Sequence, residues 1–248
     1  MENTTDKFTF KVKADLFKHA STKDHKRESS TWQKKMVLSR IACIYDPIGF
    51  AASFLIRAKI GMQQLWQIGY DWDLELPPDC CRKWIKLFQE LEELNGVTFP
   101  RYLTSTDAVR LPMLCIFSDA SREAFGACAY VRWLTSNGSY EARFMAAKSR
   151  VSPLKELTIP RLELQAAVLA ARLGKNIREE SRMHFAKIIY FTNSRIVLAW
   201  ICSEARGYKP FVSARDGETQ NNSEPSQWQH IAGEHSVTDD VSRGIKVQ

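Results

Sequence analysis

The stretch MLCIFSDASREAFGACAYVRW, residues 113–133, decides the fold. Residues 113–118 form a short apolar run that ends at Asp119, and such a run is typical of a strand. Residues 124–133 are again rich in apolar and aromatic side chains and predict a second strand. The stretch therefore predicts two successive strands, the first of which ends at an acidic residue.

The residues downstream alternate between strand and helix patterns. Ser136-Asn137-Gly138 predicts a hairpin turn, which is expected to lead into a third strand at 140–148. Pro160 suits the first turn of a helix, and this helix is expected to run to about residue 177. Further elements are predicted at 187–192 (a buried strand), 196–201 (a helix), 228–231 (a strand) and 237–245 (a short helix), with the longest loop at 203–226. This order predicts an α/β fold.

The residues upstream have a different character. Residues 1–34 are polar and charged; the alternation of Phe8, Phe10 and Val12 is consistent with one strand, and the charged cluster at 23–35 predicts a loop. Residues 35–110 are expected to form a small, mostly helical module. Its helices are predicted at 52–68 and 84–94, the second from apolar side chains that recur at three- and four-residue steps. We therefore predict three parts: 1–34, 35–110 and 111–248.

Composition excludes several classes of protein. Apolar residues make up 44% and charged residues 25% of the 248, which is typical of a globular chain and argues against extended disorder. The sequence lacks both the uncharged run that a membrane span needs and the apolar core of a signal peptide. We therefore expect an intracellular chain, cytoplasmic or nuclear, with six reduced cysteines and no membrane partner. A net charge of +7 permits a polyanionic partner such as nucleic acid.

Acidic residues lie where predicted elements begin or end. Asp119 follows the first strand of the α/β part, Glu163 lies in the first turn of the long helix, and Asp239 lies at the start of the last helix. Carboxylates gathered in this way are what a pair of Mg²⁺ ions requires. Each residue also has a purely structural interpretation, as a turn former, a first-turn helix acid or a helix cap.

The long helix carries a face of small residues after Glu163. These residues are Ala167, Ala170 and Gly174. We expect this face to pack closely against a sheet.

Five segments, in this order, resemble one family. They are LSRIACIYDPIGFAASFLIRAKIGMQQLWQIGYDWD, IFSDASREAFGACAY, LTIPRLELQAAVLAARL, IYFTNSRIVLAWI and EHSVTDDVSRG. The last four resemble the ribonuclease H domain of Bel/Pao-type LTR-retrotransposon polyproteins. The first resembles the segment that joins polymerase to ribonuclease H in them, a region often labelled a Pao retrotransposon peptidase. The resemblance covers about residues 35–245 and implies a ribonuclease H-like mixed sheet flanked by helices, preceded by the helical connection module.

The resemblance also implies a site. The family holds two Mg²⁺ ions with four acidic residues and hydrolyses the RNA strand of an RNA–DNA hybrid. Asp119, Glu163 and Asp239 match three of these positions and are the implied metal ligands. The fourth position departs from the family, which shows Thr-Asp-Ser where this chain has Thr192-Asn193-Ser194. His235 is a candidate proton shuttle beside the metals, with a solvated loop histidine as the alternative.

The change at Asn193 bears directly on catalysis. Asparagine is almost isosteric with aspartate but brings no charge, so the site would hold one Mg²⁺ or Mn²⁺ ion rather than two. We expect Asp119 and Asn193 to end neighbouring parallel strands and to face one cavity, with Glu163 opposite and Asp239 closing it. Cleavage is therefore expected to be weak or absent. Decay of a transposon copy and selection for binding without cleavage both remain open as explanations.

Other parts of the family's polyproteins have no counterpart here. The sequence shows neither the paired aspartates of a polymerase palm nor the Asp-Ser-Gly or Asp-Thr-Gly of an aspartic protease, and the length does not accommodate an integrase. We therefore expect a truncated polyprotein.

Basic residues are predicted near the nucleic-acid groove. They are Arg143, Lys148, Arg150, Lys155 and Arg161. They would neutralise phosphates, and binding would then weaken as the salt concentration rises. A solvated basic edge is the alternative interpretation.

Two functional hypotheses follow from the sequence. The first is a retroelement-derived ribonuclease H-like domain, a pseudoenzyme or weak endonuclease, that binds RNA–DNA hybrid or other nucleic acid. The second is a non-catalytic interaction protein or decayed fragment that self-associates through the apolar helices at 52–68 and 84–94. An exposed apolar patch on these helices would favour the second hypothesis.

Overall fold

The computed structural model of the chain describes residues 6–11, 32–204 and 207–245, apart from the side chains of His235 and Asp239. The chain divides into two compact units. The first comprises residues 1–47, 57–102 and 246–248, and the second comprises residues 48–56 and 103–245. The domain boundaries expected at 35 and 111 stay predictions.

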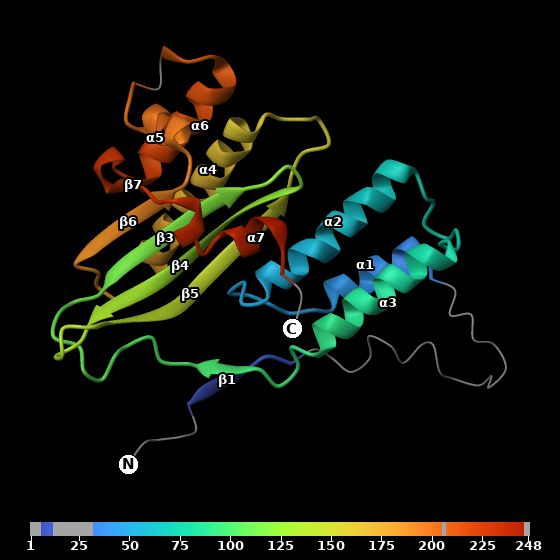
Figure 1. Cartoon of the computed structure of the whole chain (residues 1–248), viewed down its shortest axis with the longest axis horizontal. Coiled ribbons are helices and arrows are strands. Elements are labelled where there is room, and N and C mark those ends of the chain that lie inside the picture. Colours follow the sequence, from blue (N-terminus) through green and yellow to red (C-terminus); the bar gives the residue numbers. More distant parts are fainter. Residues whose placement is uncertain (1–5, 12–31, 205–206, 246–248) are drawn as a thin grey trace. The chain divides into compact units, whose positions relative to one another are not determined.

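The second unit contains the α/β part of the chain (Figure 1). Its strands are β3 (Met113–Ala120), β4 (Ala124–Leu134), β5 (Tyr140–Val151), β6 (Lys187–Thr192) and β7 (Trp228–His230). Its helices are α4 (Ile159–Glu180), α5 (Arg195–Ile201), α6 (Pro210–Asn222) and α7 (Asp239–Arg243), with short 3-10 helices η4 (Pro225–Gln227) and η5 (Gly233–His235). The strand and helix order expected for residues 111–201 is confirmed.

The five strands form one mixed sheet in the order β5-β4-β3-β6-β7. The pairs β3–β4 and β4–β5 are antiparallel, whereas β3–β6 and β6–β7 are parallel. The parallel pair β3–β6 requires a crossover, and the long helix α4 supplies it. This sheet flanked by helices is the predicted fold.

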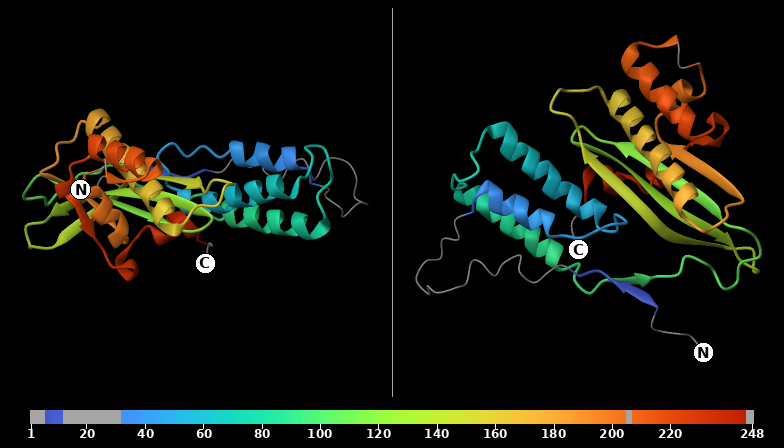
Figure 2. Two further views of the ribbon diagram at one scale, coloured as in Figure 1. Left: turned by 90° about the horizontal axis from the view of Figure 1, so that it is seen from above. Right: turned by 180° about the vertical axis from the view of Figure 1, so that it is seen from behind.

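Helix α4 covers one face of the sheet, and its small residues allow a close approach (Figure 2). Ala167, Ala170 and Gly174 face the core that Ile116 and Tyr190 build. At Gly174 an added Cβ would lie 2.2 Å from the Tyr190 hydroxyl and 2.6 Å from Ile116 Cδ1. The predicted close packing of this helix face is confirmed.

Helix α7 packs on the opposite face of the sheet. Val241 joins Ala52, Cys128 and Ala147 in a small apolar cluster there. The approach is close because Gly126 of β4 has no side chain: an added Cβ would lie 2.4 Å from Val241 Cγ1. The absence of a side chain at Gly126 therefore allows α7 to pack closely on β4, next to the strand β3 that carries Asp119.

The loop predicted at 203–226 is wrong for its larger part. Residues 210–222 form α6, which begins at Pro210 and packs against α4. The helix is rich in Gly, Ser, Asn and charged residues, which favour loops, and it buries only Val212, Asp216 and Thr219. Contact with α4 thus outweighs the weak helix propensity of the segment. Residues 205–206 lie outside the described residues.

Asp216 is an ionisable side chain in the interior of the second unit. It is fully buried in α6, and neither carboxylate oxygen has a hydrogen-bond partner among the described residues. This burial raises the pKa of Asp216 to about 6. An aspartate in an unfolded chain titrates near ~3.9, so ionisation at neutral pH weakens the fold.

We therefore expect Asp216→Asn to raise the free energy of unfolding at pH 7 by about 2 kcal/mol, because the variant has no charge to bury. The wild-type carboxyl is protonated below the unfolded pKa, and its stability falls as the pH rises from there through about 6. The gain should accordingly disappear in acid. Urea unfolding of both chains across this range measures it, and a variant less stable than the wild type at pH 7 would contradict the expectation.

The first unit is mostly helical, as expected, with one pair of short strands. Its elements are β1 (Lys7–Thr9), α1 (Lys34–Ala42), α2 (Ala52–Ile68, whose first five residues group with the second unit), α3 (Pro78–Glu92) and β2 (Thr98–Pro100). Strand β1 pairs with β2, so the strand expected around Phe8 is present, although Val12 lies outside the described residues. Helix α1 was not predicted. Of the loop expected at 23–35, residues 23–31 lie outside the described residues, and residues 34 and 35 belong to α1.

Lys34, the first residue of α1, is a buried charged residue whose ammonium group has several favourable contacts. Its ammonium nitrogen lies 3.8 Å from the ring centre of Trp66 and 4.7 Å from that of Trp72. It also donates a hydrogen bond of 2.5 Å to the Tyr70 carbonyl oxygen. These contacts compensate for lost hydration, so the charge is compatible with the interior.

In the described part of the chain, no helix combines the length and the apolar character that crossing a bilayer requires.

Candidate functional site

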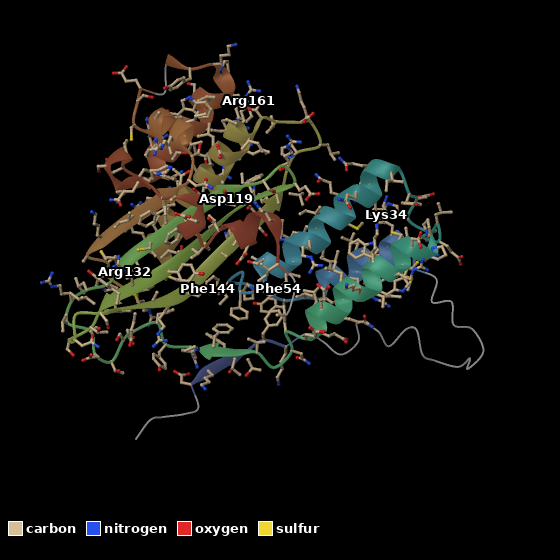
Figure 3. The ribbon with its side chains drawn as sticks, in the orientation of Figure 1. Lys34, Phe54, Asp119, Arg132, Phe144 and Arg161 are labelled. Carbon is tan, nitrogen blue, oxygen red and sulfur yellow. The ribbon has the colours of Figure 1, made fainter. Side chains whose placement is uncertain are left out.

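The site begins with two neighbouring parallel strands. In the register of β3 and β6, Ser118 lies opposite Thr192, so Asp119 and Asn193 come next at the same edge of the sheet. Asp119 is 2% exposed, and Asn193 is half-buried. Figure 3 marks Asp119 on the sheet beside α7. The expected adjacency of these two strand ends is confirmed.

Asp119 accepts two side-chain hydrogen bonds. Asn193 Nδ2 donates to Asp119 Oδ1 over 2.8 Å, and the Ser242 hydroxyl of α7 donates to Asp119 Oδ2. An ionised carboxylate only accepts hydrogen bonds, which requires Asn193 to turn its NH₂ group toward it. Asn193 Oδ1 consequently faces away and is buried without a hydrogen-bond partner among the described residues.

The turn after β6 holds Asn193 in this orientation. Thr192 Oγ1 accepts a hydrogen bond of 3.2 Å from the Ser194 backbone N–H. Ser194 is the N-cap of α5, and its hydroxyl accepts a hydrogen bond of 3.3 Å from the Val197 N–H. His230 Nε2 lies 3.2 Å from the Asn193 carbonyl oxygen. The Thr-Asn-Ser sequence thus forms a well-bonded strand-to-helix turn.

Glu163 reaches this site from the beginning of α4. Its side chain is half-buried, and burial raises the pKa of its carboxyl. A hydrogen bond with the Ser194 side chain acts in the opposite direction, and the negative charge of Asp119 raises the pKa further. Glu163 and Asp119 therefore interact electrostatically, with Ser194 beside Glu163.

Two predicted site residues have side chains outside the described part of the structure. Asp239 is the first residue of α7, and His235 is the last residue of η5. The backbone of Asp239 thus begins the helix that supplies Ser242 to Asp119. The roles of Asp239 as a metal ligand and of His235 as a proton shuttle stay predictions.

Three residues of the site escaped the sequence analysis. Ser242 and Ser194 contact Asp119 and Glu163 respectively, and His230 is exposed, with its ring next to the Asn193 carbonyl. A signal for Ser242 existed: it lies one helical turn after Asp239 in the Asp-x-x-Ser-Arg motif, so both belong to one helix face.

The predicted basic residues are divided between the edge strand and the start of α4. Lys148 and Arg150 are exposed and extend from one side of β5, the outermost strand of the sheet. Arg143 forms an ion pair with Glu141, with 3.4 Å between Arg143 Nη2 and Glu141 Oε2. Lys155 is exposed in the loop before α4. Arg161, which is labelled in Figure 3, belongs to α4. It lies over the Phe211 ring, with 5.1 Å between the guanidinium carbon and the ring centre.

Of the implied metal ligands, only Asp119 and Glu163 have described side chains. Hard cations bind several oxygen ligands, and carboxylates usually supply most of the charge. No group of three or more His, Cys, Asp and Glu side chains within the described ranges is suited to a metal ion. Both oxygens of Asp119 accept hydrogen bonds, and Asn193 presents its NH₂ group to one of them. The one-ion set of Asp119, Glu163 and Asp239 stays a prediction.

Comparison with solved structures finds several ribonucleases H. The N-terminal RNase H domain of Rv2228c from Mycobacterium tuberculosis has 12% sequence identity and a TM-score of 0.38, covering 53% of this chain and 91% of that one. LC11-RNase H1, solved in complex with an RNA/DNA hybrid, has 14% identity and a TM-score of 0.34, covering 52% and 94%. The foamy viral protease-reverse transcriptase, solved with dsDNA, has 12% identity and a TM-score of 0.46, covering 85% of this chain and 40% of that protein.

Comparison with curated protein sequences finds no match. A family model, described as Pao retrotransposon-like RNaseH-like domain, matches residues 33–194. This range is well over half of the chain and includes Asp119, Glu163 and Asn193, whereas Ser242 lies beyond it. The chain therefore belongs to the Pao retrotransposon-like RNaseH-like family.

Proposed function

We propose that this chain is a ribonuclease H-like domain of retroelement type that binds RNA–DNA hybrid and cleaves its RNA strand weakly or not at all. The observation that carries the proposal is the hydrogen bond from Asn193 to Asp119 at the ends of β6 and β3. An amide occupies the position where the family resemblance implies a carboxylate. On this proposal the ends of β3 and β6 keep the positions that the resemblance implies, while one negative charge is lost.

The loss of charge has a physical consequence for catalysis. Phosphodiester hydrolysis in this family relies on divalent ions, which supply positive charge to the scissile phosphate and activate water when bound. Asn193 contributes no charge to such an ion, and its NH₂ group repels one. Glu163, whose pKa is raised by burial and by Asp119, is itself easier to protonate than an ordinary glutamate. Binding of nucleic acid does not require these carboxylates, so it can persist without cleavage.

Binding of a labelled RNA–DNA hybrid, measured by fluorescence anisotropy over a range of salt concentrations, tests the proposal. A parallel incubation with Mg²⁺ or Mn²⁺ measures cleavage of the RNA strand. We expect salt-dependent binding with little cleavage. Absence of binding at low salt would reject the proposed function.

We expect the double substitution Lys148→Ala/Arg150→Ala to weaken hybrid binding by about tenfold and to reduce the slope of log affinity against log salt by about 2. Both side chains are exposed on the same side of β5, and each would release counterions from one phosphate. The charge-matched control is Lys83→Ala/Lys86→Ala on α3, where both lysines are exposed. Equal affinities of the two double variants would remove Lys148 and Arg150 from the interface.

Self-association through the connection helices is a second candidate function. Trp66 and Ile68 of α2 are 51% and 66% exposed. Ile68 also lines a cavity of about 410 Å³, together with other residues of α2 and α3 that include Leu65, Trp84 and Leu87. Exposed apolar surface of this kind favours association. The molecular mass in solution, measured by size exclusion with and without hybrid, distinguishes hybrid binding from self-association. An oligomer whose mass does not change when hybrid is added favours self-association.

A further inference from the structure

Asp119 is a buried carboxylate at the meeting point of three elements. It lies on β3, its first hydrogen-bond donor follows β6, and its second belongs to α7. A second bond strengthens the attachment of α7, because the Ser121 hydroxyl donates to the Ser242 carbonyl oxygen over 2.8 Å. We call Asp119, Asn193 and Ser242 the Asp119 cluster.

The Asp119 cluster stabilises the buried Asp119 carboxylate with neutral hydrogen-bond donors. A buried carboxylate requires either a neighbouring cation or hydrogen-bond donors that satisfy it. Here one donor satisfies each oxygen, and all donors are neutral. If residue 193 were a second carboxylate, two acceptors would face each other at hydrogen-bond distance and would need a cation or a shared proton between them.

We propose that Asn193 and Ser242 are positioning residues that take over the role of a divalent cation, so that α7 remains fastened to the sheet in the absence of metal. The inference rests on the proposed function for the expectation that a cation would otherwise occupy this site. The orientation of Asn193 supports it: the amide leaves its own buried Oδ1 without a described partner while its NH₂ group contacts Asp119. The contact with Asp119 therefore determines how this side chain is placed.

Hydrogen exchange of the backbone amides at 238–245, with EDTA or with saturating Mg²⁺, tests the inference without any nucleic acid. The amides of Val241, Ser242 and Gly244 are hydrogen-bonded within this segment and report whether α7 is attached. In the wild type we expect the same slow exchange in both conditions. In Asn193→Asp we expect exchange to be about tenfold faster in EDTA and to return to the wild-type rate with Mg²⁺, the tenfold corresponding to about 1.4 kcal/mol.

A reversed pair provides the rescue variant, and it also covers the case in which Asn193→Asp does not fold. In Asp119→Asn/Asn193→Asp the amide and the carboxylate exchange places. Residue 119 can then donate to residue 193 and still accept from Ser242. We expect slow exchange at 238–245 that is indifferent to Mg²⁺, as in the wild type.

Ser118→Ala is the matched control. The Ser118 hydroxyl also connects β3 to β6, but its hydrogen bond of 3.1 Å goes to the Phe191 carbonyl oxygen rather than to Asp119. Its removal should weaken the sheet without creating any response to Mg²⁺. A merely structural role of Asn193 would give the same pattern as this control.

Three results would overturn the inference. The first is exchange in the wild type that slows when Mg²⁺ is added, which would mean that a cation still fastens α7. The second is Asn193→Asp exchange in EDTA as slow as in the wild type. The third is a reversed pair that exchanges fast and is slowed by Mg²⁺. Because hybrid is absent throughout, these results are separate from any failure of the proposed nucleic-acid binding.

Discussion

Replacing Asn193 with aspartate is expected to increase the rate of RNA-strand cleavage in an RNA–DNA hybrid by at least about 100-fold, or about 2.7 kcal/mol of activation free energy. The substitution hardly changes the volume of the side chain, and it returns one negative charge beside Asp119. The NH₂ group that now contacts Asp119 Oδ1 over 2.8 Å disappears, and the new carboxylate then faces that of Asp119. Affinity for Mg²⁺ or Mn²⁺ should rise because charged oxygens bind hard cations more strongly than an amide does.

The reversed pair Asp119→Asn/Asn193→Asp is the control for this gain. It has the same number of carboxylates as the wild type and keeps a hydrogen bond between residues 119 and 193, but the negative charge moves from residue 119 to residue 193. We expect it to fold and to show no increase in cleavage. Initial rates on a labelled hybrid, with isothermal titration of Mg²⁺ in parallel, compare the three chains.

Two outcomes would contradict this view of the site. A wild-type chain that already cleaves as fast as Asn193→Asp would show that the missing carboxylate is not needed. If neither chain cleaves hybrid or binds Mg²⁺, then the assignment of Asp119, Glu163 and Asn193 to the family's positions has failed. Self-association through α2 and α3 would then be the better proposal.

The sequence predicts best those parts of the fold whose pattern depends on burial alone. The apolar run at β6 predicts a strand buried on both faces, and the small face of α4 predicts close packing on a sheet. The parallel pair β3–β6 itself was expected from the family resemblance. Helix α6 was missed because its polar residues satisfy a loop pattern equally well, and only its contact with α4 decides between them. Propensity and tertiary contact disagree there, and the contact prevails.

The candidate site divides in the same way. The acidic positions and Asn193 could be proposed from motifs, because each lies at an element boundary. The hydrogen bond from Ser242 to Asp119 could not, since it joins residues far apart in the sequence through the packing of Val241 over Gly126. Such contacts depend on where two elements meet in space, and the Asp-x-x-Ser-Arg motif indicates only that Ser242 shares a helix face with Asp239.

The close packing of α4 leads to the second large expected effect: Gly174→Val should lower the free energy of unfolding of the second unit by about 3 kcal/mol. A Cβ at this position would lie 2.2 Å from the Tyr190 hydroxyl and 2.6 Å from Ile116 Cδ1. Neither neighbour can move easily, because both are buried and the Tyr190 ring is stacked on Trp228 with 4.9 Å between ring centres. Helix α4 would have to shift away from the sheet.

Gly217→Ala is the matched control, since Gly217 lies within α6 and no atom would come within 4 Å of an added Cβ. This substitution should stabilise the chain by about 0.5–1 kcal/mol through the higher helix propensity of alanine. Urea unfolding followed by circular dichroism gives both values. A Gly174→Val chain as stable as the wild type would show that α4 does not approach β3 and β6 this closely. The placement of Glu163 beside Ser194, which depends on the position of α4, would then be unsupported.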